Sequence, residues 1–453
     1  LVVTCDCGVS NAAEVDVARS LGLDVIVTDH HLPPATLPRA VAVVDPHRAD
    51  CTYPDPELTG AGVAYKLAAA LLARHGRRAA DLAAVAAIGT IADMAPMIGE
   101  SRAIVRLGLA ELAQTSRAGL RALLARATPD PSQPSAHDLA FGVAPRINAA
   151  GRIAEAELAI SLLLEEDAAH AEQLADELEA VHLERRALTA AAVDEARLLV
   201  ADEAADGPLV VRGTWAPGLI GLIAGRLSDL LARPVAVVTG VGDELRGSVR
   251  APADFHVATA LDACATHLTK RGGHAAAGGF SLTETTWAAF VTAFGALSRP
   301  FPGGVVGAVE RGGRLAVDLV LPASYLGWSL ADELDRLAPY GPGHVEPLLA
   351  VTGLQVVEAR RVGSDADHVL LRLRRGVEVF DGIAFATPAD RPLPEPGSAV
   401  DLVARLERDL YQGIPRLRLR VLDYADAAAS PLAARRLAPV TMAPAAAAAG
   451  SPA

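Results

Sequence analysis

An aspartate followed by two histidines offers the clearest chemistry in this sequence. Asp29, His30 and His31 come directly after a mostly apolar run at residues 23–27, with Thr28 between. In open α/β sheets, ligands bind beyond the carboxyl ends of the strands. Adjacent side chains leaving a strand end can therefore point into one crevice, and a carboxylate beside two imidazoles predicts a metal site there.

A second carboxylate occupies an equivalent position upstream. Residues 1–5 are predicted to form a buried strand, and Asp6 stands in the turn before a helix that begins near Ala12. One right-handed crossover between the two strands would bring Asp6 and His30 to the same edge of the sheet. The two motifs are then expected to face each other.

Two further aspartates lie at the ends of predicted elements. Asp45 follows a third apolar run at residues 40–44, and Asp93 stands in a turn after an apolar helix around residues 83–88. Oxygen-rich ligand sets with a few histidines favour Mn²⁺ or Mg²⁺ over structural Zn²⁺. For Asp45, and for Asp6 if it stood alone, a turn-forming or helix-capping role is the alternative.

Four ordered motifs resemble those of the DHH phosphoesterases. They are Asp-Cys-Gly at residues 6–8, Asp-His-His at residues 29–31, Gly-Thr-Ile-Ala-Asp at residues 89–93 and Gly-Gly-His-Ala-Ala-Ala-Gly-Gly at residues 272–279. Within that family, residues 145–152 and the C-terminal region resemble the exonucleases that degrade single-stranded DNA from 5′ to 3′. The resemblance extends over roughly residues 1–425.

The resemblance implies a two-metal site that uses Mn²⁺ or Mg²⁺. Asp6 would bridge both ions, and His30 and Asp93 would complete the ligands of one of them. With Asp29 and His31, these residues form the expected catalytic group. Two-metal hydrolysis relies on both ions to activate water and to stabilise the attacking and leaving oxygens.

One motif of the family, Asp-x-Asp, has no counterpart in the sequence. It would lie on an earlier strand, whereas the sequence opens at Leu1 inside an apolar run and without an initiator methionine. We expect an N-terminally incomplete copy in which the second ion is poorly held. Hydrolysis by this fragment is therefore expected to be weak or absent.

Three segments are candidates for contact with DNA phosphates. Residues 145–152 combine a proline, an asparagine and a glycine with two arginines, which suggests a turn near a phosphate; a helix cap with solvated arginines is the alternative. Residues 247–250 supply a hydroxyl, N–H groups and a guanidinium. Glycines at 272–273 allow close approach of the backbone. The expected substrate-binding residues are Arg146, Asn148, Arg152, Ser248, Arg250, Gly273 and His274.

Two positions depart from the family pattern. Ala216 follows Trp215 where the family often has a histidine, which would weaken a phosphate contact. Cys7 stands where asparagine is common, which would alter the surroundings of Asp6.

Composition limits the class of protein. A chain of 453 residues predicts two to four domains, and a net charge of −13 argues against a generally basic nucleic-acid binder while leaving room for a local basic groove. The four cysteines lack the spacing of metal fingers or of a disulfide scaffold. No signal peptide or membrane-spanning apolar stretch is present in the sequence, so a cytoplasmic protein is expected.

The expected fold class is α/β with a C-terminal β-barrel. Short apolar runs separated by turns in the C-terminal third are typical of a small five-stranded barrel; they lie at 348–351, 355–357, 368–373, 377–385, 399–404 and 416–421. The predicted parts are a doubly wound parallel-sheet DHH domain at 1–165, incomplete at its N terminus, a linking helix at 166–205, a smaller α/β DHH-associated domain at 206–300, an oligonucleotide-binding (OB) barrel at 301–425 and a disordered Ala/Pro-rich tail at 426–453.

The resemblance implies a metal-dependent exonuclease that degrades single-stranded DNA from 5′ to 3′ into 5′ mononucleotides during DNA repair and recombination. It is expected to be monomeric, with single-strand-binding protein and a helicase as partners. One alternative is a DHH phosphodiesterase acting on short oligonucleotides or cyclic dinucleotides, against which the barrel argues. The other is a non-catalytic nucleic-acid-binding paralogue, against which the retained Asp6, His30, His31 and Asp93 argue.

Overall fold

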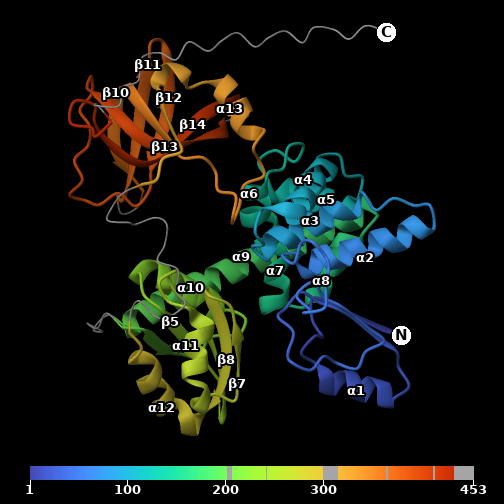
Figure 1. The fold of residues 1–453 in the computed structure, drawn as a ribbon. Coiled ribbons are helices and arrows are strands. Elements are labelled where there is room, and N and C mark those ends of the chain that lie inside the picture. The colour runs from blue at the N-terminus through green and yellow to red at the C-terminus, as the bar shows by residue number, and fades with distance from the viewer. Residues whose placement is uncertain (201–206, 241, 299–314, 364–365, 412–413, 433–453) are drawn as a thin grey trace, which may run out of the picture. The chain divides into compact units, whose positions relative to one another are not determined.

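The computed structural model describes residues 1–200, 207–240, 242–298, 315–363, 366–411 and 414–432 of the chain. The chain forms two compact units, Leu1–Arg314 and Leu315–Ala453, which are coloured from blue to yellow and from orange to red in Figure 1. Within the described ranges, no helix combines the length and the apolar character that crossing a bilayer requires.

The first unit opens with a small parallel sheet. Its three strands, β1 (Val2–Cys5), β2 (Val25–Thr28) and β3 (Ala42–Val44), pair in chain order. The prediction that the first strand is buried is wrong: β1 is largely exposed, because it lies at the edge of the sheet and pairs only with β2 among the described residues. Helix α1 (Ala12–Ser20) makes the crossover between β1 and β2, and its Val15 packs against the buried Val25 and Val27. Because Cys5 pairs with Thr28, the residues that follow both strands emerge side by side.

Helices make up the rest of the first α/β part. The predicted alternation of strands and helices is confined to residues 2–44, and the following elements are α2 (Gly60–Arg74), α3 (Leu82–Ala92), α4 (Gly99–Ala113), α5 (Ala118–Ala127), α6 (Ala136–Asp138), the π-helical turn Leu139–Val143, α7 (Ala144–Ile153) and α8 (Ala156–Leu164). Small residues let these helices pack closely. A Cβ on Gly108 of α4 would lie 2.3 Å from the carbonyl oxygen of Ala83 in α3.

The prediction of a turn at residues 145–152 is wrong, because this segment lies within helix α7. Pro145 stands in its first turn, where the missing N–H and the fixed φ of proline are tolerated. The predicted linking helix is confirmed as α9 (Ala168–Leu199), whose first turn is capped by the side chain of Asp167. Residues 201–206, at the predicted end of this linker, lie outside the described residues.

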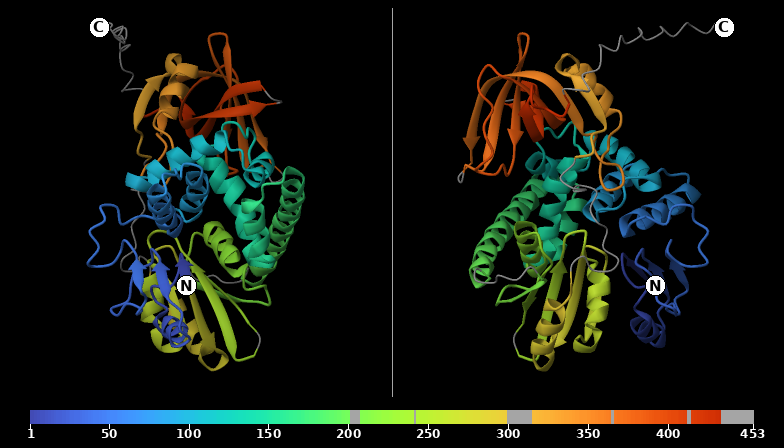
Figure 2. Two further views of the ribbon diagram at one scale, coloured as in Figure 1. Left: turned by 90° about the vertical axis from the view of Figure 1, so that its right-hand side faces the viewer. Right: turned by 60° about the vertical axis from the view of Figure 1, so that its left-hand side comes forward.

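A second sheet, of mixed direction, follows α9. Its strand order is β4-β5-β6-β8-β7, with β4 (Leu209–Arg212) parallel to β5 (Val235–Thr239), and with β6 (Glu244–Arg250), β8 (Ala277–Thr283) and β7 (Lys270–Gly273) antiparallel to their neighbours. The helices of this part are α10 (Ile220–Leu231), α11 (Val257–Ala263) and α12 (Glu284–Gly295). Figure 2 shows the green and yellow helices lying against this sheet.

The second unit is a closed barrel with an added edge strand. The barrel strands are β10 (Leu349–Val362), β11 (His368–Arg375), β12 (Glu378–Ala384), β13 (Ala399–Tyr411) and β14 (Ile414–Asp426), and the pairing of β11 with β10 closes it. Strand β9 (Leu319–Pro322) pairs with β10, and α13 (Trp328–Asp335) lies beside the barrel.

The predicted five-stranded barrel is confirmed, with one change. The runs expected at 348–351 and 355–357 form a single strand, β10, whose register shifts around Gly353. Gly353 has a φ of 79°, which glycine adopts readily in a bulge. Ordered structure continues to Leu432, so the first residues of the predicted disordered tail are folded, and residues 433–453 lie outside the described residues.

Candidate metal and phosphate site

The first strand ends in a turn that directs Asp6 towards α2. Asp6 has a φ of 64°, a conformation that aspartate visits more easily than most residues. Its N–H donates to the carbonyl oxygen of Thr28 over 3.0 Å. A Cβ on Gly60, the first residue of α2, would lie 2.3 Å from Oδ1 of Asp6. The Asp6 carboxylate therefore packs directly against the backbone of α2, at a position where a side chain would not fit.

His30 joins carboxylates from two distant parts of the sequence. Its Nε2 lies 3.0 Å from Oδ1 of Asp6 and 3.6 Å from Oδ2 of Asp93, the residue that follows α3. The hydrogen bond with Asp6 raises the pKa of His30, and the charge of Asp93 raises it further. Partial burial raises the pKa of Asp93, and Asp6 also contributes in that direction. Negative charge is thus concentrated around one imidazole.

Asp29 holds the Asp29–His31 motif in place through hydrogen bonds. It is buried, and its carboxylate accepts hydrogen bonds from the N–H groups of Val9 and His30 at 2.9 and 2.8 Å and from Nδ1 of His31 at 2.7 Å. Burial alone would raise the pKa of Asp29, but the hydrogen bonds outweigh it and the pKa is lowered. Asp29 is therefore held ionised, and it leaves Nε2 of His31 available.

Asp6, His30 and His31 together can hold a metal ion. One potential ligand atom from each lies within 4.8 Å of the other two, a span that fits a single ion at about 2.0–2.6 Å from each ligand. The carboxylate of Asp6, with that of Asp93 beside His30, suits Mn²⁺ or Mg²⁺. The structure thus brings His31 to the predicted ligands Asp6 and His30, with Asp93 beside them.

Asp45 lies near this cluster but fits the alternative that the sequence left open. Its Oδ1 accepts the N–H of His47 over 2.8 Å, as in an Asx turn. Burial raises the pKa of Asp45, with Asp29 as a further contributor. Asp45 therefore forms the turn after β3.

Metal affinity is expected to fall as the pH drops through the raised pKa of His30. The imidazole must be neutral to bind an ion. Because the pKa of His30 is raised above the ordinary histidine value of 6.5, a competing proton stays on the ring at higher pH than in a free histidine. Below that pKa, affinity should fall about tenfold per pH unit for one displaced proton. Titration with Mn²⁺ followed by electron paramagnetic resonance at several pH values measures this, and a pH-independent affinity would contradict it.

Replacing Gly60 with alanine is expected to weaken metal binding although Gly60 offers no ligand. The added methyl would displace the Asp6 carboxylate, because its position lies within 2.7 Å of the Asp6 Oδ1, Cβ and Cγ atoms. Loss of a supporting contact of this kind lowers metal affinity by about 10- to 100-fold. Gly327→Ala is the control for a glycine at the start of a helix with open space around it, and equal Mn²⁺ affinities in the two variants would refute the argument.

A second group of polar side chains lies on β6. Arg250 is partly buried, and its Nη1 donates to Oγ of Ser248 over 2.9 Å. Gly221 and Gly225 of α10 make room for it, since a Cβ on Gly221 would lie 3.2 Å from Nη2 of Arg250. Burial lowers the pKa of Arg250, and the charge of Arg152 lowers it further.

The arginines of α7 differ in their surroundings. Nη1 of Arg152 donates to the carbonyl oxygen of Gly218 over 3.0 Å, and burial lowers the pKa of Arg152. Arg146 instead donates to both carboxylate oxygens of Glu179, at 2.5 and 3.1 Å. Asn148 is exposed on the same helix. The structure therefore places Arg152 beside the β6 group, whereas the charge of Arg146 is neutralised within the protein.

Sequence reasoning missed Arg185, which the structure adds to this group. It lies on α9, and burial lowers its pKa, followed by the charge of Arg152. The arginines come from α7, α9 and β6, so their proximity depends on tertiary packing. The sequence around Arg185 offers no local signal of it.

The glycine-rich loop after β7 connects the two groups. Gly273 has a φ of 154°, and a Cβ there would lie 2.4 Å from the carbonyl oxygen of Ala277. The N–H of His274 donates to that same oxygen over 2.8 Å. The charge of His274 acts on the pKa of Asp93, so the loop faces the cluster around His30.

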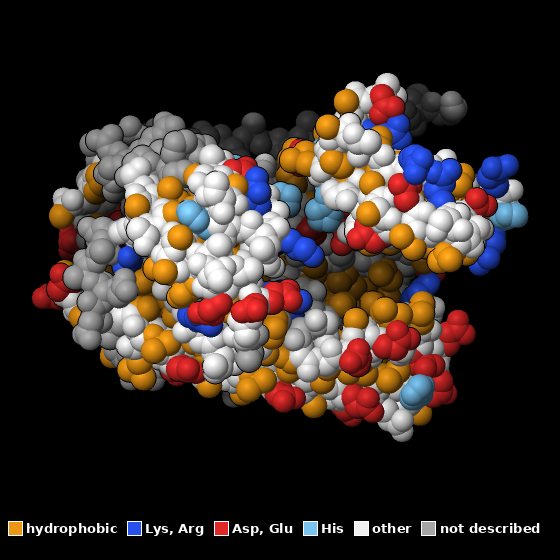
Figure 3. Space-filling model, turned by 90° about the horizontal axis from the view of Figure 1, so that it is seen from below, with side chains coloured by type: hydrophobic (Ala, Val, Ile, Leu, Met, Phe, Trp, Pro, Cys, Tyr) orange, Lys and Arg blue, Asp and Glu red, His pale blue; other side chains and the backbone are white. Residues whose placement is uncertain are grey.

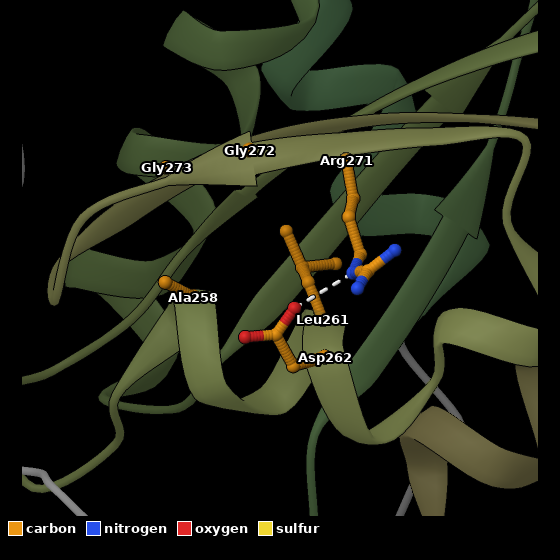
Figure 4. Close-up of a pocket in the computed structure, with 6 residues that line it drawn as sticks. All are labelled: Ala258, Leu261, Asp262, Arg271, Gly272 and Gly273. Carbon is orange, nitrogen blue, oxygen red and sulfur yellow. Dashed lines mark hydrogen bonds and ion pairs between the residues drawn. The ribbon is translucent and has the colours of Figure 1, made fainter. Parts of the chain in front are cut away.

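A cavity of about 330 Å³ opens beside this loop, between α11 and β7. Figure 4 shows Gly272 and Gly273 on one side of it and the ion pair of Arg271 with Asp262 across its mouth, with 2.7 Å between Nε and Oδ1. The backbone of the glycine-rich loop is therefore accessible to a ligand from this side.

Basic side chains do not dominate the described part of the face drawn in Figure 3. On the described part of the face seen in Figure 3, lysines and arginines are interspersed with acidic and hydrophobic side chains. This agrees with the net charge of −13. A polyanion would therefore be attracted locally, at grouped arginines, rather than over a whole face.

Three family models match the chain. The N-terminal domain of the DHH family matches residues 1–90, the DHHA1 domain matches residues 206–297 and the RecJ OB domain matches residues 317–423. Their order is that of the two sheets and the barrel.

Curated relatives share about a third of their residues with the chain. The single-stranded-DNA-specific exonuclease RecJ of Bacillus subtilis is 33% identical over 94% of this chain and 54% of its own length. The RecJ proteins of Salmonella typhimurium and Escherichia coli are 33% and 34% identical, over 77% and 70% of their lengths. The chain thus spans about half the length of the Bacillus relative.

Solved structures show the same fold. RecJ of Thermus thermophilus in complex with Mn²⁺ superposes with a TM-score of 0.77 at 34% identity and covers 94% of this chain and 61% of its own. The Mg²⁺ complex gives a TM-score of 0.72 at 32% identity, over 93% of this chain and 61% of its own.

Proposed function

This chain belongs to the RecJ family of single-stranded-DNA-specific exonucleases, and on that premise we propose that the complete protein hydrolyses single-stranded DNA from the 5′ end and releases 5′ mononucleotides. The observation that carries the proposal is the joint presence, in one compact unit, of the cluster at Asp6, His30 and Asp93 and of the arginine group on β6 and α7. The first suits a metal ion, and the second suits a phosphate.

Mn²⁺ or Mg²⁺ is the proposed cofactor, since related structures were solved with each. Asp6, His30 and His31 would hold the ion, with Asp93 as a further oxygen ligand. When bound, such an ion polarises the phosphodiester and favours deprotonation of water. Asp29 positions His31 by accepting the proton of its Nδ1, which fixes the orientation of the ring.

The β6 group is the proposed receptor of the 5′ phosphate. Ser248 offers a hydroxyl, and the guanidinium groups of Arg250 and Arg152 offer charged donors in a setting partly shielded from water. Gly273 and His274 are proposed to contact the scissile phosphate, because Gly273 pairs with β8, the neighbour of β6, and the charge of His274 acts on the pKa of Asp93. With its 5′ phosphate and the scissile phosphate both bound, the terminal nucleotide would be positioned for cleavage.

Asn148 and Arg146 are proposed as contacts at the border of the DNA groove. Asn148 is free to reach a ligand from the exposed face of α7. Arg146 would have to release Glu179 first, so its contribution to DNA affinity is expected to be smaller than that of Arg152.

The barrel is the proposed binding surface for the rest of the strand. Phe385 is 53% exposed, and Arg420 and His368 lie 5.9 and 5.1 Å from its ring centroid. An exposed aromatic ring beside a guanidinium can stack on a nucleobase. Such a surface favours a polymeric substrate over a dinucleotide.

The proposed setting is the cytoplasm, where chromosomal DNA is repaired and recombined. A site that accepts single strands needs a helicase to expose them and meets them coated by single-strand-binding protein, so both are the expected partners. A monomer is the expected state, which light scattering in solution measures.

The four cysteines are free thiols in the structure.

The proposal is tested with a single-stranded oligonucleotide that carries a fluorophore at its 3′ end, incubated with the complete protein and Mn²⁺. We expect a ladder that shortens from the 5′ end, release of 5′ mononucleotides and little cleavage of the duplex. Asp93→Asn should suppress the ladder because it removes a carboxylate beside His30.

Two results would overturn the proposal and support the alternatives. Cleavage of cyclic dinucleotides or short oligonucleotides, with longer strands left intact, would indicate a small-substrate phosphodiesterase. Tight binding of single strands without metal-dependent cleavage would indicate a non-catalytic nucleic-acid-binding protein.

A further inference from the structure

Three arginines without acidic partners in the described part of the chain come from elements that pack together. Arg250 lies against Gly221 of α10, and Arg152 of α7 donates to the carbonyl oxygen of Gly218, just before α10. Helix α9, which carries Arg185, packs against both α7 and α10. The charge of Arg152 lowers the pKa of Arg250, and it also lowers that of Arg185. Two more arginines, Arg186 and Arg226, add to the effect on Arg185. Among the described residues, no carboxylate contributes to the pKa shift of Arg152, Arg185 or Arg250.

The hydrogen-bonding groups of Arg185 are poorly satisfied. Its Nε is buried and has no partner among the described residues. Its Nη2 lies 3.4 Å from Nδ1 of His182, and that nitrogen is also 3.3 Å from the carbonyl oxygen of Pro145. If Nδ1 donates its proton to Pro145, it has no lone pair left to accept from Arg185.

Other arginines of this region are neutralised. Arg146 pairs with Glu179, and Arg126 pairs with Glu172 and Asp176. A half-buried guanidinium that lacks such a partner is destabilising unless an anion binds to it. The exposed Arg186 and Arg226 at its rim increase the attraction for that anion.

We propose that Arg185 forms a second phosphate-binding position, next to the one at Ser248 and Arg250. The inference rests on the proposed function, which supplies the nucleic-acid strand. A guanidinium presents paired donors that match two phosphate oxygens. The phosphate is either the first phosphodiester of the strand or a further phosphate of a 5′ triphosphate end.

The test is the affinity of the metal-free protein for single-stranded oligonucleotides, measured by fluorescence anisotropy at several salt concentrations in the presence of chelator. Arg185→Ala should lower affinity by about 10- to 100-fold and should reduce the slope of log affinity against log salt by about 0.7, the value for one phosphate contact. The control, Arg197→Ala, removes an exposed charge from the same helix and should change neither.

The affinities for strands with 5′ hydroxyl, 5′ monophosphate and 5′ triphosphate ends show whether Arg185 binds the first phosphodiester or a phosphate of a triphosphate end. A loss common to all three assigns Arg185 to a phosphodiester, and a loss confined to the triphosphate strand assigns it to a polyphosphate end. Wild-type affinity of Arg185→Ala for all three strands would overturn the proposal.

Thermal unfolding distinguishes binding from a structural role. Because Arg185 lacks an acidic partner, the ligand-free Arg185→Ala protein should melt at or above the wild-type temperature, and a lower melting temperature that accompanies the weaker binding would overturn the proposal. The binding assay needs no hydrolysis, so a failed exonuclease assay would leave this result interpretable.

Discussion

Replacing His30 with alanine is expected to lower kcat/KM for single-stranded DNA by about 10³-fold or more, because the variant loses the ligand that joins Asp6 to Asp93. A metal ion contributes several kcal/mol of transition-state stabilisation, and about 4 kcal/mol corresponds to a factor of about 10³ in rate. The measurement is exonuclease activity at fixed Mn²⁺ in the complete protein, together with the Mn²⁺ dissociation constant.

The control for this variant is His137→Ala, which removes an exposed imidazole from helix α6. It should leave both activity and metal affinity unchanged. Should the His30 variant keep wild-type activity at limiting Mn²⁺, the metal site is placed incorrectly. A loss of activity with unchanged Mn²⁺ affinity would instead make His30 a group that acts on the substrate.

Arg250→Ala is expected to remove most of the preference for 5′-phosphorylated strands. Loss of one partner of a partly buried charged hydrogen bond weakens binding by about 2 kcal/mol or more, which is about 30-fold. Affinity for the same strand with a 5′ hydroxyl should change far less, because the contact is with the terminal phosphate. Competition between the two strands, read by anisotropy, measures the preference.

Arg246→Ala is the matched control, since Arg246 lies on the same strand, is exposed and pairs with Glu244. Its removal takes away one charge without touching Ser248, so it should keep the preference. An Arg250 variant that still discriminates 5′ phosphate from 5′ hydroxyl as well as the wild type does would place the end-group site elsewhere.

Local pattern was sufficient to predict the elements that carry the metal cluster. Valines at residues 25 and 27 alternate with partly exposed positions and are buried in β2, and a turn with Asp6 precedes a helix. Parallel pairing then brings Asp6 and His30 to one edge, as the spacing predicts. The barrel was predictable for the same reason, since period-two runs separated by turns specify strands.

Residues 145–152 show where pattern reading failed. Proline, asparagine and glycine suggested a turn, but proline in a first helical turn and glycine in the last turns are compatible with a helix. Tertiary packing decides the conformation, because α7 packs against α9 and Ala149 and Ala150 of α7 are buried in the fold.

Contacts between distant residues could not be predicted from the sequence. Gly60 supports Asp6 only because α2 approaches β1, and Arg185 joins Arg152 only because α9 passes the end of α7. Neither residue has a local signature. Such partners become visible only when the fold brings their elements together.

The central claim is that Asp6, His30 and His31 hold a catalytic metal ion. The most direct test is X-ray diffraction from Mn²⁺-soaked crystals, with data collected at the manganese absorption edge. The account predicts an anomalous peak within bonding distance of Asp6 and His30, which disappears in His30→Ala crystals. A peak elsewhere in the unit, or no peak in crystals of protein that degrades DNA with Mn²⁺, would contradict it.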